Sequence, residues 1–122
     1  MNRLPTFIYD SILLRCGDQT TEPPLKIYEK LDPEFLKHVE NSGEFVFNDG
    51  AFPKKFKLLI AMAFDASFGT VQGVKSLARE AIEAGATQEE ITEALRVAQH
   101  LSGVGCIYTA GRALKELFEE RT

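Results

Sequence analysis

Reactive side chains are few in this sequence, and their spacing limits the chemistry that they could perform. The 122 residues contain two cysteines, Cys16 and Cys106, and two histidines. The cysteines stand far apart and form no Cys-x-x-Cys pair, in which two sulfur atoms one helical turn apart can close a disulfide. Cys, His and carboxylate residues do not cluster at the spacing of metal ligands. We therefore predict that the protein uses no metal and no other cofactor.

Asp65 is the carboxylate with the strongest claim to a catalytic role. It follows Met62 and Phe64 near the expected end of a helix, where burial and the negative end of the helix dipole would both raise its pKa. A carboxyl group with a raised pKa can serve as a general acid or base. The commoner alternative is that Asp65 is half-exposed or pairs with Lys75 or Arg79, because structural ion pairs perturb carboxylates as readily as function does.

Cys106 and His100 are the other candidate site residues. Cys106 begins a helix after a Gly-x-Gly turn, where free backbone N–H groups would stabilise a thiolate and make it reactive. The commoner role of a lone cysteine is that of a small buried apolar residue. The turn is not a dinucleotide-binding motif, because no strand precedes it and the third glycine is absent. His100 is expected on the polar face of its helix, as a solvated or interface residue.

Helices are predicted to position these residues, with no convincing alternating strand. Asp32 can accept hydrogen bonds from the free N–H groups of a helix that starts at Pro33 and turns Phe35 inward. Thr87 and Glu90 form a capping box that opens a later helix. The fold class is therefore all-α, a single-domain helical bundle. The expected helices cover residues 25–31, 33 to either 43 or 47, 53–67, 71–84, 87 onward and 106 onward.

The helix expected over residues 53–67 is apolar nearly all round between Leu58 and Phe64. A helix with one side in water would not need apolar residues on every side. We therefore expect this helix to lie in the centre of the fold or in a subunit interface.

Composition narrows the class of protein. Hydrophobic residues at 44% and charged residues at 26% are ordinary for a soluble globular domain. The net charge of −4 argues against a nucleic-acid partner. No apolar run approaches the roughly 18 residues of a membrane span, and the first residues, interrupted by Asp10 and Arg15, do not form a signal peptide. With two separated cysteines, a reducing cytoplasm is the expected location.

Two short motifs give this sequence a family likeness. They are the A-G-A-T-x-E-E-I step over residues 84–91 and the G-x-G-x-x-x-x-x-A-x-R-A-L tail from Gly103 to Leu114. In these and in the helix before them, the chain resembles the carboxymuconolactone decarboxylase family, which includes the alkyl hydroperoxide reductase D-type thiol enzymes. The resemblance implies a domain over residues 31–119, preceded by an N-terminal extension over residues 1–30.

The resemblance also implies which residues occupy the family's active site. In the redox members a helix reading E-L-I-A-x-A leads into G-C-x-x-C-x-x-x-H. Laid on this sequence without a gap, the glutamate falls on Leu58, the two cysteines on Thr70 and Gly73, and the histidine on Leu77. None of these four residues can perform thiol redox chemistry. The pocket that they line would be apolar, and we expect a family member without thiol peroxidase activity.

Two functions remain open on this basis. In the first, the protein acts on or binds a small carboxylated or aromatic metabolite, as a lyase or isomerase would, with Asp65 two helical turns from Leu58 on the face that holds the family's site. In the second, it is a non-catalytic oligomeric binding or scaffold module. Family members form trimers or hexamers, so a homo-oligomer is expected in both cases. A cavity between Leu58, Thr70 and Leu77 would favour the first function, and tight packing the second.

Overall fold

The computed structural model of the chain describes residues 24–121, and these residues form helices without a strand. This confirms the all-α fold class. Cys16 and the segment considered as a signal peptide lie outside the described residues. The elements are a short 3-10 helix η1 (Pro24–Ile27), α2 (Tyr28–Leu31), α3 (Pro33–Phe47), α4 (Lys54–Ser67), α5 (Val71–Glu83), α6 (Gln88–Ser102) and α7 (Gly105–Arg121). None of the helices in this part of the chain has the length and apolar character needed to cross a membrane.

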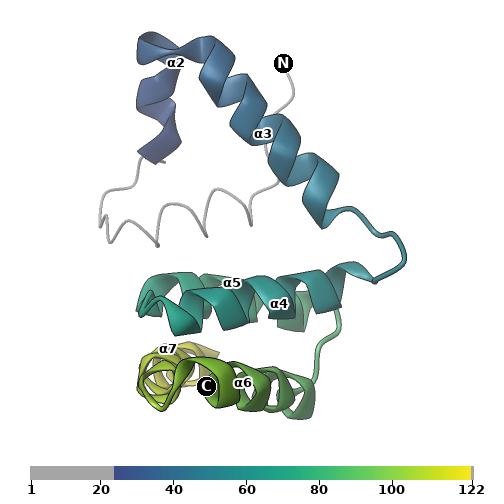
Figure 1. The fold of residues 1–122 in the computed structure, drawn as a ribbon, viewed down its shortest axis with the longest axis vertical. Helices are drawn as coiled ribbons and strands as arrows, with labels where there is room; N and C mark the ends of the chain where they lie inside the picture. The colour runs from purple at the N-terminus through teal and green to yellow at the C-terminus, as the bar shows by residue number, and fades with distance from the viewer. Residues whose placement is uncertain (1–23, 122) are drawn as a thin grey trace.

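The helices divide into a four-helix body and an arm. Figure 1 shows α4 and α5 as one layer lying over a second layer of α6 and α7, with α2 and α3 extending away from both. Of the residues of α3, Leu36 is buried. The prediction that Phe35 turns inward is wrong, because about half of this side chain is exposed. Its ring instead packs edge-on against Tyr28 of α2, with 5.6 Å between ring centroids.

Local signals in the sequence set the ends of the helices. The Asp32 carboxylate accepts a hydrogen bond from the N–H of Phe35 and opens α3. Thr87 and Glu90 form the predicted capping box, with the Thr87 Oγ1 accepting from the N–H of Glu90 and the Glu90 Oε1 accepting from the N–H of Thr87. Gly69 ends α4 with a φ of 81°, in the left-handed region where residues with a side chain are strained.

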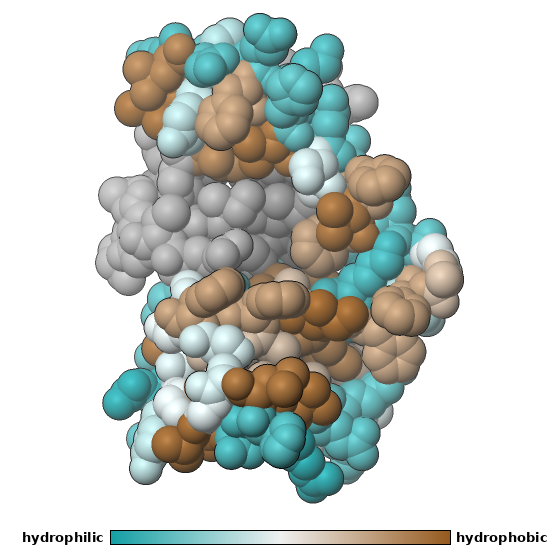
Figure 2. Space-filling model, viewed as in Figure 1, coloured by the Kyte–Doolittle hydropathy of each residue, from teal (hydrophilic) through white to brown (hydrophobic). Residues whose placement is uncertain are grey.

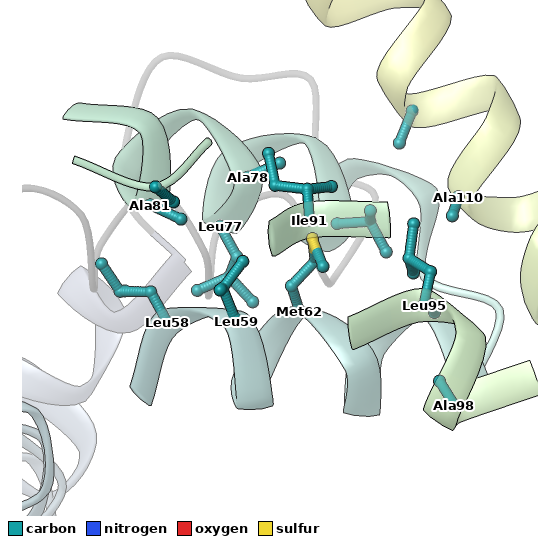
Figure 3. Packing of buried hydrophobic residues seen from close by; sticks show 14 of the residues in the cluster. Leu58, Leu59, Met62, Leu77, Ala78, Ala81, Ile91, Leu95, Ala98 and Ala110 are labelled. Atoms are coloured by element: carbon teal, nitrogen blue, oxygen red, sulfur yellow. The ribbon is translucent and has the colours of Figure 1, made fainter. Parts of the chain in front are cut away.

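The core lies where α4 faces α5 and α6. In Figure 3, Leu58, Leu59 and Met62 point from α4 toward the other helices of the body. Full burial of one such side chain stabilises the fold by about 1.5–3 kcal/mol, so this face of α4 contributes much of the stability of the body. The partners of these three residues in the core are Leu77, Ala78 and Ala81 of α5, Ile91 and Leu95 of α6, and Ala110 of α7.

α4 and α6 run side by side in the same direction. Near their starts, the Lys55 ammonium pairs with the Glu90 carboxylate at 3.1 Å. Near their ends, the Ser67 Oγ donates a hydrogen bond to the Ser102 Oγ at 3.1 Å. We call this line of contact the α4–α6 seam. Its two ends present different surfaces, which are described below.

Candidate functional site

The inner face of α4 carries the candidate acid together with two core residues. Leu58 and Met62 are 0% exposed and Asp65 is 2% exposed. The helical spacing therefore placed all three on one buried face, as predicted. The alternative in which Asp65 is half-exposed is wrong.

The basic residues considered as partners of Asp65 lie elsewhere. Lys75 pairs with Glu116 at 3.5 Å and also with Glu120, and Arg79 pairs with Glu120 at 3.3 Å. These ion pairs connect α5 to α7, and the Lys75 ammonium lowers the pKa of Glu120 below its ordinary value. Asp65 is linked instead to the start of α5 through its backbone, because its carbonyl accepts a hydrogen bond from the N–H of Thr70 at 2.9 Å.

The four residues that the sequence resemblance would place at the family's active site lie on α4 and α5 or directly before α5. Leu58 and Leu77 (2% exposed) belong to the same hydrophobic core. Gly73 is buried on α5, and Thr70, directly before α5, is half-buried. The structure thus brings Leu58 and Leu77 into one packed cluster.

One polar side chain in this region was not singled out from the sequence. Ser76 of α5 is fully buried, and its Oγ has no hydrogen-bond partner within residues 24–121. A buried hydroxyl without a partner costs about 1–3 kcal/mol. Serine is common in helices, so no sequence pattern signalled the burial of this one. Together with Asp65, Ser76 makes the α4–α5 packing more polar than leucines at positions 58 and 77 would suggest.

Cys106 and His100 differ in their exposure. Cys106 is an unpaired cysteine buried in the hydrophobic core, in the first turn of α7. This is the position of a small apolar residue, the commoner role considered from the sequence. His100 is exposed in the last turn of α6, as expected.

At the starts of α4 and α6, the seam is hollowed into a groove of about 610 Å³ that the sequence analysis missed. Eight of its lining residues are apolar and two are glutamates. The i, i+4 spacing of Phe56 and Ile60 was the available signal, because it puts both on the outer side of α4. The lining residues are Ala51, Phe52 and Pro53 from the α3–α4 loop, Phe56, Leu59 and Ile60 from α4, and Glu90, Glu93, Ala94 and Val97 from α6.

At the other end of the seam, large apolar side chains on α4, α6 and the start of α7 are exposed. We call this surface the end patch, and it consists of Phe64, Phe68, Leu101, Val104 and Tyr108. The Phe64 and Phe68 rings stack with 6.4 Å between centroids, and the Ser67–Ser102 hydrogen bond joins the two helix ends that carry the patch. Figure 2 shows apolar side chains gathered over α4 and α6 on this face of the molecule.

The arrangement defines a class of protein, a helical body in which a helix hairpin with a short glycine turn packs on two further helices. Comparison with known proteins gives the family. The model of the carboxymuconolactone decarboxylase family matches residues 33–116. The chain therefore belongs to the carboxymuconolactone decarboxylase family, as its motifs predicted.

The chain is 29% identical to "Uncharacterized protein MJ1511" of Methanocaldococcus jannaschii over 93 residues, which cover 76% of this chain and 87% of that protein. No solved structure matches the chain with comparable significance.

Proposed function

We propose that this protein is a homo-oligomeric binding or scaffold module of the carboxymuconolactone decarboxylase family, without thiol peroxidase chemistry. The observation that carries the proposal is the packing of Leu58 and Leu77. In the register proposed from the sequence, these residues stand where the redox members have a glutamate and a histidine. Both are buried in the hydrophobic core, so both positions now serve the packing of α4 on α5.

The end patch supports the oligomeric part of the proposal. Leu101 is 80% exposed and Phe68 is 70% exposed, and exposed apolar patches of this kind mark interaction sites. Charged residues are absent from positions 66–74 and 97–111, apart from the titratable His100. Interface cores are depleted in charge in the same way. A trimer or a hexamer would cover this surface.

Mass measurement tests the assembly. We expect native mass spectrometry of the full-length protein to give a trimer or hexamer. The double variant Phe68→Glu, Leu101→Glu should dissociate at the same protein concentration while its circular dichroism stays helical. The control is Gln99→Glu, which adds charge to an exposed position of α6 away from the seam. A monomeric wild-type protein, or dissociation of the control as well, would contradict the proposal.

A second candidate function is supported by Asp65. Asp65 is 2% exposed, and a carboxyl group is rarely buried to this extent because burying charge is costly unless the group is paired. Its place on the same face as Leu58 is that expected for an acid or base acting on a small carboxylated or aromatic metabolite. In this function, proton transfer by the Asp65 carboxyl would assist a decarboxylation or isomerisation.

Replacement of Asp65 separates the two functions. Purified protein is incubated with a panel of carboxylated and aromatic metabolites, and their consumption is followed by mass spectrometry. If the second function is right, wild type consumes a member of the panel and Asp65→Asn loses this turnover while keeping its helical fold. Turnover that survives the substitution would eliminate Asp65 as the catalytic group.

A further inference from the structure

The groove at the starts of α4 and α6 is an open, mostly apolar depression in the surface. Its volume of about 610 Å³ falls within the range of ligand pockets, about 300–1,000 Å³. Phe52 and Phe56 give it aromatic walls, and Ile60 and Val97 extend the apolar surface along the seam. All four of these side chains are exposed, so a bound apolar group would remove their surface from water.

The loop that forms one wall of the groove is held in place by polar contacts. The Asp49 carboxylate accepts a hydrogen bond from the N–H of Lys54 at 2.7 Å. The Lys57 ammonium donates to the carbonyl of Asn48 at 2.5 Å, and the N–H of Gly50 donates to the carbonyl of Phe52 at 3.1 Å. The backbone N–H of Lys54 and the Lys57 ammonium therefore brace this wall.

The charges that line the groove are both negative. Glu90 and Glu93 are its two ionisable lining residues. The N–H of Thr87, and next the Lys55 ammonium, lower the pKa of Glu90, which therefore stays ionised at neutral pH. Glu93 is exposed and forms no ion pair with residues 25–120. An anionic ligand would meet two carboxylates here, whereas a cation would meet an unshared one.

Lys55 shows how an ammonium group can be held at the edge of the groove. The Lys55 Nζ lies 5.1 Å from the centroid of the Phe56 ring and 3.1 Å from the Glu90 carboxylate. An ammonium over an aromatic face beside a carboxylate gains from the ring quadrupole and from the opposite charge. Glu93, one helical turn after Glu90 on α6, offers a second carboxylate to the same aromatic groove.

We propose that this groove binds a small organic cation, an ammonium group carried on an apolar chain or ring. The apolar part lies against Phe52, Phe56 and Ile60, and the ammonium lies at Glu93. This inference goes beyond the proposed assembly, because the groove and the end patch occupy opposite ends of the seam and share no residue.

Three probes of matched shape test the proposal: 4-phenylbutylamine, 4-phenylbutan-1-ol and 4-phenylbutanoate. Binding to the full-length protein is measured by calorimetry and by NMR shifts. We expect the amine to bind roughly three- to ten-fold more tightly than the alcohol, from one exposed ion pair and one cation–π contact. The carboxylate should bind most weakly. A groove that prefers the alcohol or the carboxylate, or that binds no amine at millimolar concentration, would overturn the proposal.

Matched variants locate the ammonium. Glu93→Gln should remove the preference for amine over alcohol and leave the affinity for the alcohol unchanged. The control Glu89→Gln makes the same charge change one turn earlier on α6, outside the groove, and should preserve the preference. Lys55→Met, which releases the Glu90 carboxylate, should increase amine affinity. If Glu93→Gln and Glu89→Gln lose the preference for amine over alcohol equally, only the overall charge of the protein matters. That result would refute a site at Glu93. Amine binding that appears only after the end-patch variants dissociate the protein would show that a second copy occupies the groove in the assembly, and would also overturn the proposal.

Discussion

The two faces of α4 are built from similar residues and have opposite surroundings. The inner face, with Leu58, Leu59 and Met62, is buried within the chain. The outer face, with Phe56, Ile60 and Phe64, is exposed. Since both faces are apolar, the hydrophobic effect alone does not explain why one is covered and the other is not. The inner face holds the fold together, and the exposed outer face is the one that we propose for contacts with other molecules.

A charge placed on each face of α4 should give the largest difference in stability between the two faces. Met62→Lys would bury an ammonium without a partner, at a cost of several kcal/mol that approaches the whole stability of a small domain. We expect this variant to be unfolded. Phe64→Lys should remain folded, because its charge reaches water, and should weaken assembly. Circular dichroism and native mass spectrometry check both. A folded Met62→Lys protein would show that the inner face is less tightly packed than the structure indicates.

Truncation of one side chain on each face should give the same difference in stability on a smaller scale. Leu58→Ala leaves a cavity in the core and should lower the free energy of unfolding by about 2–5 kcal/mol. Ile60→Ala removes a half-exposed side chain and should cost less than about 1 kcal/mol. Urea unfolding at several protein concentrations measures both. If Ile60→Ala costs as much as Leu58→Ala at every concentration, the distinction between the faces fails.

Loss of the helix cap at the start of α6 should have a smaller effect on the free energy of unfolding. Thr87→Ala removes the side chain that accepts the N–H of Glu90 and should lower the free energy of unfolding by about 1 kcal/mol. The control is Thr92→Ala on the same helix, whose Oγ1 donates to the Glu89 carbonyl and caps no helix end. Its effect should stay within about 0.5 kcal/mol. Equal effects of the two variants in urea unfolding would argue against the capping role of Thr87.

The dependence of stability on pH should show the smallest effect. The N–H of Thr87 and the Lys55 ammonium lower the folded-state pKa of Glu90 from its ordinary value of about 4.5. The stability that this provides is therefore fully present above that value and is lost as the pH falls through the lowered pKa. Glu90→Gln should make the loss of stability below about pH 4.5 less steep than in Glu89→Gln, as measured by thermal unfolding. Parallel curves for the two variants would contradict the assignment.

Local features of this fold could be predicted from the sequence, and contacts between distant segments could not. The Asp32 cap and the Thr87–Glu90 capping box depend on neighbouring residues, and both are present. In both cases the sequence contains the whole interaction. The spacing of Asp65 relative to Leu58 predicted the face of α4 on which it lies, whereas its burial was left open by the sequence and is given by the structure.

The incorrect and missing predictions involve partners far away in the chain. Lys75 binds Glu120, 45 residues later, rather than the nearby Asp65. The exposure of Phe35 depends on how α3 lies relative to the body, which the amphipathic pattern of α3 does not specify. The groove was missed because its walls come from a loop and two helices that meet only in the folded chain. The spacing of residues along one segment does not show which distant segments will be in contact.

The parallel course of α4 and α6 has a consequence for the folding route. The contacts at the two ends of the seam, Lys55–Glu90 and Ser67–Ser102, each join residues 35 apart. The chain must therefore return along α5 before either contact can form, and each closes a loop at an entropic cost. We expect the α4–α5 hairpin to form early and the seam to close late. Substitutions at Lys55 or Ser102 should then speed unfolding while leaving the folding rate nearly unchanged. Slower folding of either variant in stopped-flow measurements would place the seam in the folding nucleus instead.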